Sequence, residues 1–425
     1  MEKTPLLDLT DIRKCYSKNN SEDIVVIDSC NLKVFSGEII ALLGRTGSGK
    51  STLLRMIAGL IDPTSGVVSM PSNDNLKLAM VFQNFALFPW LTVLQNVELG
   101  LKAAGMPANI RREKALHTID VVGMDGFESA YPKELSGGMC QRVGIARALV
   151  VEPDILLMDE PFSALDVLTA ENLRNDILDL WFDNKTNIQS IIMVTHNIEE
   201  AAIMADRILI FGANPGYIKA DIPNNLSHPR DENETNLKSL VDEVYQVLSY
   251  HNSHQKKRQS KIDIFHRIPG VAVPELSGLL ENLESSETNV ALDLSELADE
   301  VHLDVNNLFE LTEILELLTF AKISDGKIEL TDLGRLYATA DVLDQKNMFA
   351  KQLLLHVPLA AYIKKELEQE PTHKISKRDL MQVLEQKLSA TAAEEVLTTI
   401  VDWGRFAEIF AYNANAETLS LEDPS

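Results

Sequence analysis

Residues 44–52 have the residue types and spacing of a loop that binds phosphate groups. They fit the pattern G-x-x-x-x-G-K-[ST], in which glycines let backbone N–H groups turn toward an anion at the start of a helix. Lys50 would supply positive charge to the β- and γ-phosphates of a nucleotide, and Ser51 would place a hydroxyl on Mg²⁺. The predicted nucleotide-binding residues of this loop are Gly44, Arg45, Thr46, Gly47, Ser48, Gly49, Lys50, Ser51 and Thr52.

Two adjacent carboxylates, Asp159 and Glu160, follow the apolar stretch 155–158. Two acids at the end of a buried strand cost free energy unless a cation or a reaction lies nearby. We therefore predict that Asp159 holds Mg²⁺ through water and that Glu160 is the general base that polarises the attacking water. The alternatives are a plain glycine turn at 44–52 and a solvated strand end at 159–160, and finding both patterns in one chain argues against them.

The elements that would position these groups alternate between strands and helices. Helices are expected at 53–60, within 92–123 and at 136–150. Strands separated by helices predict a parallel, doubly wound α/β sheet. The expected strands are 24–27, 39–43, 77–82, 155–158, 191–195 and 207–211.

The second half of the chain has a different pattern. Helices over 294–301 and 306–320, followed by a hairpin at 323–330, are typical of a winged helix. Helices are expected to fill 346–400, and a hairpin at 410–421 to close a mainly α-helical region. The predicted domains are residues 1–250 and 270–425, joined by a linker at 251–269 that begins with a polar, unpatterned run.

Charge supports this division and argues against nucleic acid as a partner. The formal charge is −24, and residues 271–425 contribute −17 of it through 12 basic and 29 acidic side chains. The segment 306–320, in the recognition position of the winged helix, carries Glu310, Glu313 and Glu316 and no Lys or Arg. Phosphate contacts need basic groups, so we expect no DNA binding.

Cysteine content and hydropathy indicate where the protein works. Three cysteines in 425 residues cannot form a disulfide framework, so we expect a reducing cytosol. The N-terminus lacks the apolar core of a signal peptide, and no apolar run approaches 18 residues. If the protein serves a membrane process, another chain must cross the membrane.

A third motif lies between the first two. Residues 135–142 read Leu-Ser-Gly-Gly-Met-Cys-Gln-Arg and open a predicted helix. On these ordered motifs, residues 5–245 resemble the ATP-binding subunits of ABC transporters, although Met139 stands where many relatives carry Gln and Cys140 where a basic or polar residue is common. The resemblance implies a P-loop NTPase fold with a helical subdomain, ATP and Mg²⁺ as cofactors, and ATP hydrolysis coupled to transport.

Further site residues follow from the resemblance alone. It implies that Gln83 binds Mg²⁺ and acts in catalysis with Glu160, that His196 senses the γ-phosphate, and that Tyr16 stacks on adenine. The D-loop would comprise Ser163, Ala164, Leu165 and Asp166. The signature segment would comprise Leu135, Ser136, Gly137, Gly138 and Met139.

The resemblance also implies that each ATP site is shared between two ATPase domains packed head to tail. Ser136, Gly137 and Gly138 of one domain would donate hydrogen bonds to the γ-phosphate of an ATP held by the phosphate loop of the other. Because this chain has one such domain, a dimer is required, either of identical chains or with a paralogous ATPase.

Residues 88–97, Phe-Pro-Trp-Leu-Thr-Val-Leu-Gln-Asn-Val, resemble a stretch of nitrate, sulfonate and taurine importers. Residues 211–218 resemble their Pro-Gly-(Arg)-Ile segment, with Tyr217 where Arg is usual. The expected protein is an energy-coupling subunit, peripheral on the cytoplasmic face of the inner membrane. Its partners would be permease subunits and, indirectly, a periplasmic solute-binding protein that determines the solute. The alternative is a soluble regulator or scaffold with the same fold.

Residues 270–425 resemble the AAA-associated C-terminal domain that is fused to some of these importer ATPases. We expect this region to support the dimer, regulate ATP turnover or sense a cytosolic metabolite, with the effector left open. The residues that carry this resemblance lie at 278–280, 297–300, 333–335, 356–359 and 402–405.

Overall fold

The structure is a computed structural model, and it describes two compact units, one ending at Val244 and the other starting at Tyr245. Residues 250–262 lie outside the described residues, so the predicted linker stays a prediction. The described residues are 4–16, 24–73, 76–182, 186–213, 215–231, 234–249, 263–285, 291–301, 303, 305–324 and 326–421.

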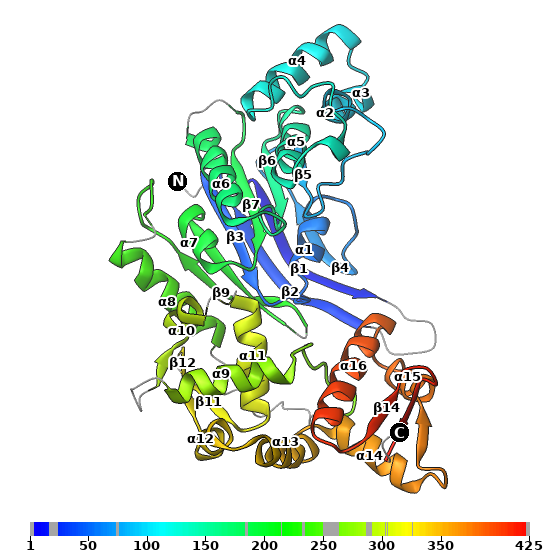
Figure 1. Ribbon diagram of the computed structural model, residues 1–425. Helices are drawn as coiled ribbons and strands as arrows, with labels where there is room; N and C mark the ends of the chain where they lie inside the picture. The colour runs from blue at the N-terminus through cyan, green and yellow to red at the C-terminus, as the bar shows by residue number, and fades with distance from the viewer. Residues whose placement is uncertain are drawn as a thin grey trace. The chain divides into compact units, whose positions relative to one another are not determined.

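A six-stranded sheet forms the centre of the first unit (Figure 1). Its strand order is β5-β6-β7-β3-β8-β9, and every pair is parallel except β8 with β9. Since β5, β6 and β7 are parallel neighbours, the residues that follow them meet at one edge of the sheet. The strands are β3 (Glu38–Gly44), β5 (Leu78–Val81), β6 (Ile155–Asp159), β7 (Ser190–Thr195), β8 (Arg207–Gly212) and β9 (Tyr217–Pro223).

A second, antiparallel sheet of order β2-β1-β4 packs against the first and encloses helix α1. The core that results is formed by alternate residues of the central strands, such as Ile40 and Leu42 of β3, together with Leu53 and Leu54 of α1. Burial of these side chains fixes the start of α1 against the end of β3. The elements are β1 (Leu7–Tyr16), β2 (Ile24–Val34), β4 (Ser65–Ser69) and α1 (Lys50–Ile57).

Four helices, α2 to α5, gather at one end of the first unit as a helical subdomain (Figure 1). Thr92 caps α2 and Ser136 caps α5 through their side-chain oxygens, which explains where these helices begin. The helices of the unit are α2 (Val93–Val97), α3 (Leu99–Ala103), α4 (Ala108–Val121), η1 (Pro132–Glu134, a 3₁₀ turn), α5 (Gly137–Leu149), α6 (Val167–Phe182), α7 (Ile198–Met204) and α8 (Thr235–Ser249), which runs across the unit boundary.

The second unit is mainly helical, with a core that includes the fully buried Trp403, whose Nε1 donates to the Val271 carbonyl at 2.8 Å. Its two small sheets have the orders β10-β12-β11 and β13-β15-β14. The elements are α9 (Val273–Ser285), β10 (Leu292–Asp293), α10 (Leu294–Val301), α11 (Val305–Leu317), β11 (Ala321–Ser324), β12 (Lys327–Leu330), α12 (Asp332–Thr339), α13 (Val342–His356), α14 (Pro358–Gln369), β13 (Lys374–Ser376), α15 (Lys377–Leu384), α16 (Ala390–Phe406), β14 (Ala411–Asn413) and β15 (Thr418–Ser420).

The structure confirms the α/β class of the first unit and the predicted order of helix, helix and hairpin at 294–330. Three features differ from the prediction. Strand β13, which pairs with β15, interrupts the helices predicted to fill 346–400. The central sheet has an antiparallel edge strand, β9, and β1 and β4 form a sheet that the sequence patterns did not indicate, since their apolar residues do not alternate cleanly. None of the helices in the described ranges is both long and apolar enough to cross a membrane.

Candidate active site

The phosphate loop joins β3 to α1 and folds around its own lysine. Lys50 is the first residue of α1 and is 4% exposed. Its Nζ donates hydrogen bonds to the carbonyl oxygens of Gly44 at 2.5 Å and Arg45 at 2.9 Å. Gly47 and Gly49 have φ values of +76° and +99°, which side chains other than glycine rarely adopt. The loop therefore places one ammonium group among backbone groups at a helix N-terminus, as a polyphosphate site requires.

Burial lowers the pKa of Lys50 to about 8, although the carboxylates of Glu160 and Asp159 act in the opposite direction. A bound triphosphate favours the protonated amine, so affinity for ATP should be constant below pH 8. Above pH 8 it should fall by up to about tenfold per pH unit, because binding must then take up a proton. ATP titrations between pH 7 and pH 9.5 measure this effect.

Two variants identify the titrating group. Lys50→Arg keeps its charge and should remove the decline in affinity above pH 8. The pKa of Lys219 on β9 is also lowered to about 8, by burial and then by Arg45, so Lys219→Met is the matched control. A decline that disappears in Lys219→Met and persists in Lys50→Arg would contradict the assignment to Lys50.

A hydroxyl and a carboxylate meet beside the loop and form a pair suited to Mg²⁺. The Oγ of Ser51, on α1, donates to Oδ1 of Asp159, at the end of β6, at 2.7 Å. Asp159 is 3% exposed, and Arg55 lies 3.9 Å from its other oxygen. Hard oxygen ligands of this kind suit Mg²⁺, which keeps several waters when it binds a nucleotide. These two residues therefore fit the ion predicted for them.

Glu160 lies at the centre of a cluster built from three neighbouring strands. Its Oε2 accepts a hydrogen bond from Nε2 of Gln83 at 2.8 Å and lies 3.5 Å from Nδ1 of His196. Gln83 follows β5, Glu160 follows β6 and His196 follows β7, so the parallel order of the strands brings them together. The structure thus groups the three predicted catalytic residues. Gln83 was also predicted to bind Mg²⁺ with Ser51 and Asp159. Its hydrogen bonds join it to Glu160 and Ser163, whereas Ser51 and Asp159 are hydrogen-bonded to each other.

The hydrogen bond with His196 is the main cause that lowers the pKa of Glu160, although burial opposes it. The carboxylate is therefore ionised at neutral pH and can accept a hydrogen bond from water. The backbone of Glu160 has φ +47°, and its N–H donates to the Val194 carbonyl at 3.0 Å. A left-handed conformation in a non-glycine residue is a form of strain that often marks functional sites.

Two residues of the signature segment, Ser136 and Gly137, are exposed at the start of α5, whereas Gly138 is buried. Ser136 Oγ accepts the N–H of Met139 at 3.3 Å. A Cβ atom built on Gly137 would have as nearest neighbours Ala164, Leu165 and Phe85, each at 3.8 Å. The segment therefore lies beside the D-loop and the residues after Gln83. The D-loop itself is fixed by Asp166, whose Oδ1 accepts the N–H of Thr169 at 3.1 Å.

Arg147, which the sequence patterns did not single out, holds the backbone after Gln83. From α5 it donates to the carbonyl oxygens of Phe85 at 2.9 Å and Ala86 at 2.6 Å, and both of these residues have positive φ values. Tyr16, at the end of β1, is 45% exposed, and Lys14 Nζ lies 5.1 Å from the centre of its ring. An exposed aromatic face of this kind is available for stacking.

Gly216 is a second residue that the sequence patterns did not assign to the site. Its N–H donates to the Val26 carbonyl at 2.8 Å, and its own carbonyl accepts from Asp28. A Cβ atom built there would collide with the backbone oxygen of Ser48, in the phosphate loop, and would lie 2.8 Å from the Phe211 ring. The absence of a side chain at Gly216 thus allows two backbones to pack closely.

Gly216→Ala should weaken ATP binding about tenfold, because overpacking of this kind costs about 1–3 kcal/mol. Titration with a fluorescent ATP analogue measures the effect. Gly144→Ala on α5 is the matched control, since its methyl group would lie 3.7 Å from the Phe85 oxygen, in ordinary contact. Equal affinities of the two variants would contradict a role for Gly216 in shaping the loop.

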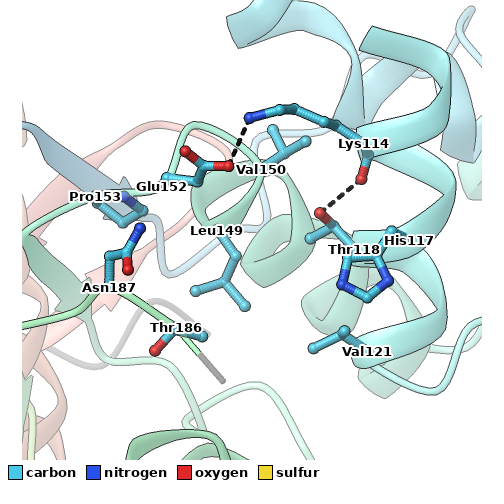
Figure 2. A pocket seen from close by; sticks show the side chains of 10 residues that line it. All are labelled: Lys114, His117, Thr118, Val121, Leu149, Val150, Glu152, Pro153, Thr186 and Asn187. Carbon is cyan, nitrogen blue, oxygen red and sulfur yellow. Dashed lines mark hydrogen bonds and ion pairs between the residues drawn. The ribbon is translucent and has the colours of Figure 1, made fainter. Parts of the chain in front are cut away.

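A cavity of about 170 Å³ between α4 and the residues after α5 is distinct from this cluster (Figure 2). Two of the residues that line it, Lys114 and Glu152, form an ion pair at 2.6 Å. This volume is below the roughly 300–1,000 Å³ of small-molecule sites, so we assign no ligand to it.

Comparison with known proteins agrees with these motifs. Residues 27–163 match the ABC transporter family model. The nitrate import ATP-binding protein NrtD of Synechocystis sp. is 43% identical over 231 residues, which cover 53% of this chain and 84% of the relative. The chain belongs to the ABC transporter ATP-binding family. Residues 295–413 of this ABC ATPase match the C-terminal AAA-associated domain.

Two further similarities extend the comparison of the ABC ATPase. The aliphatic sulfonates import ATP-binding protein SsuB of Bacillus thuringiensis subsp. konkukian is 38% identical over 246 residues, covering 57% of this chain and 95% of the relative. A solved dimeric ATP-binding cassette in a post-hydrolysis state, bound to ADP and Pi, is 32% identical and covers 52% of this chain and 100% of that chain, with a TM-score of 0.46. The family, fold class and enzyme class predicted from the motifs are confirmed.

Proposed function

We propose that this ABC ATPase is the energy-coupling subunit of an importer for nitrate, sulfonate, taurine or a related small anion. The named relatives are nitrate and aliphatic sulfonate import ATP-binding proteins, which supports this substrate class. The observation that carries the ATPase role is the meeting of Gln83, Glu160 and His196 at the ends of three adjacent strands, next to the Ser51–Asp159 pair.

In this proposal each residue of the cluster has one task. Lys50 and the glycine backbone bind the β- and γ-phosphates, and Gln83 and His196 orient a water against the Glu160 carboxylate. Mg²⁺ held near Ser51 and Asp159 would neutralise charge on the phosphate oxygens. The contacts of the Glu160 carboxylate with Gln83 and His196 would hold it in place beside this water.

The site is completed by a second ATPase domain. Ser136 and Gly137 are exposed at the positive end of α5, which is thirteen residues long, and their neighbours in the same chain are the D-loop and the residues after Gln83. We place the γ-phosphate of the partner copy against this segment. Val167 and Leu168, which follow the D-loop and are 82% and 71% exposed, would be covered in the same dimer.

The surface proposed to bind the permease is formed by Phe88 and Trp90. Trp90 is 69% exposed and Phe88 is 42% exposed, and their ring centres lie 5.4 Å apart. Paired exposed aromatic rings are typical anchors of protein interfaces. With a permease bound there, the ATPase would be peripheral on the cytoplasmic face of the membrane.

Trp90→Ala tests this surface. The variant should lose most of its association with the permease, because an aromatic anchor of an interface contributes about 2 kcal/mol or more. It should keep the ATP hydrolysis rate of the isolated protein, because Trp90 lies outside the catalytic cluster. Affinity purification from membranes measures the association, and Phe127→Ala, another exposed aromatic residue, is the control. If the unchanged protein were recovered only from the soluble fraction, the regulator or scaffold alternative would replace the importer.

A further inference from the structure

The second unit contains a cavity of about 490 Å³ between α9 and α11. From α9 it is lined by Glu275, Gly278, Leu279 and Asn282, whose spacing places them on one face of the helix. From α11 it is lined by Asn307, Glu310 and Leu311. The volume lies within the range of sites for small molecules, and no residue so far assigned to ATP hydrolysis takes part in it.

Gly278 forms an open part of the wall. A Cβ atom built on this residue would meet no heavy atom within 4 Å. Glycine inside a helix is destabilising compared with alanine, and here neither a positive φ nor a close approach of backbones requires it. Gly278 is exposed, so it lies where the cavity opens to solvent, and a larger side chain there would narrow the opening.

Asn282 supplies an unsatisfied acceptor. Its Oδ1 is buried and has no hydrogen-bond partner in the described structure. A buried acceptor without a partner is unfavourable, and a bound molecule with an N–H group would satisfy it.

The charge of the residues that line the cavity indicates which class of ligand it would bind. Glu275 and Glu310 bring carboxylates from both helices, and none of the described residues around the cavity is basic. Leu279 and Leu311, each nearly fully buried, add apolar wall. A metal ion does not match this set, because the described residues contain no group of three or more His, Cys, Asp or Glu that could hold one.

We propose that this cavity binds a small organic cation, an amidinium, guanidinium or ammonium group attached to an apolar portion. Its N–H groups would pair with the carboxylates and with Asn282 Oδ1, and its apolar part would lie on the leucines. The inference is independent of the proposed transport function, since it uses only residues of the second unit.

Benzamidine is the probe, because it joins an amidinium to a flat apolar ring, and benzoate is its counterpart of opposite charge. Isothermal titration of the full-length protein should show benzamidine binding in about the millimolar range or tighter, and at least tenfold weaker binding of benzoate. Equal binding of the two molecules, or no heat from benzamidine at about 10 mM, would overturn the proposal.

Two pairs of variants locate the binding. Gly278→Leu narrows the opening of the cavity and should weaken benzamidine binding about tenfold or more, whereas Gly278→Ala should change it less than about threefold. Glu310→Gln, which preserves shape, should also weaken binding, and Glu316→Gln, an exposed residue on the same helix outside the cavity, should leave it unchanged. Wild-type affinity in both Gly278→Leu and Glu310→Gln would place the probe elsewhere and refute the site.

Discussion

Glu160→Gln should lower the rate of ATP hydrolysis by about a hundredfold or more while ATP binding persists. The amide keeps the size and the hydrogen bond reach of the carboxylate, but it cannot take a proton from water. Lys50, Ser51 and Asp159 are untouched, so the phosphate loop and the Mg²⁺ pair remain as they are. Phosphate release and ATP titration, measured on the same sample, separate the two effects.

The Gln variant should also accumulate an ATP-bound dimer, because closed dimers would form and then fail to turn over. Size-exclusion chromatography with ATP and Mg²⁺ measures this. Glu171→Gln, an exposed carboxylate on α6, is the control and should hydrolyse ATP like the unchanged protein. Wild-type turnover by Glu160→Gln would show that another group activates the water.

Mixing two inactive variants should restore ATP hydrolysis if each site is shared between two chains. Lys50→Ala removes the phosphate-loop charge, and Ser136→Arg places a bulky cation at an exposed position of the signature segment. Each variant alone should have almost no activity, since both sites of its homodimer are damaged. In the mixed dimer one site combines an intact Lys50 with an intact Ser136, so activity should recover to about a quarter of the wild-type value.

Recovery of activity in the mixture distinguishes an ATP site shared between two chains from an ATP site within one chain. If Lys50 and Ser136 of the same chain served one ATP, every site in the mixture would carry one defect and no activity would return. The double variant, Lys50→Ala with Ser136→Arg in one chain, is the control. Mixed with either single variant it leaves every shared site damaged, and it should restore nothing.

The contiguous motifs made the site largely predictable. The phosphate loop is one unbroken segment, so its conformation follows from local glycines and the helix after it. The meeting of Gln83, Glu160 and His196 depends on three separate strands, but a parallel order of neighbouring strands could be expected from the alternation of strands and helices.

Long-range packing supplied what the sequence patterns did not indicate. Gly216 matters because its own backbone lies against Ser48, which is far from it in the sequence, and nothing in the residues around Gly216 indicates this contact. Arg147 is an ordinary helical residue until the fold brings the carbonyls of Phe85 and Ala86 beside it. The cavity at Gly278 likewise arises from two helices separated in the chain, although the glycine itself was among the residues that carried the family resemblance.

The hydrogen bonds from Arg147 to the backbone after Gln83 would couple the two ATP sites of the proposed dimer. Helix α5, which carries Arg147, begins at the signature segment. A displacement of that segment by the partner's nucleotide would therefore move α5 and, through Arg147, the backbone after Gln83. The position of the Gln83 side chain in one site would then depend on whether the other site holds a nucleotide. Through this linkage the nucleotide bound in one site would change how the water is aligned in the other.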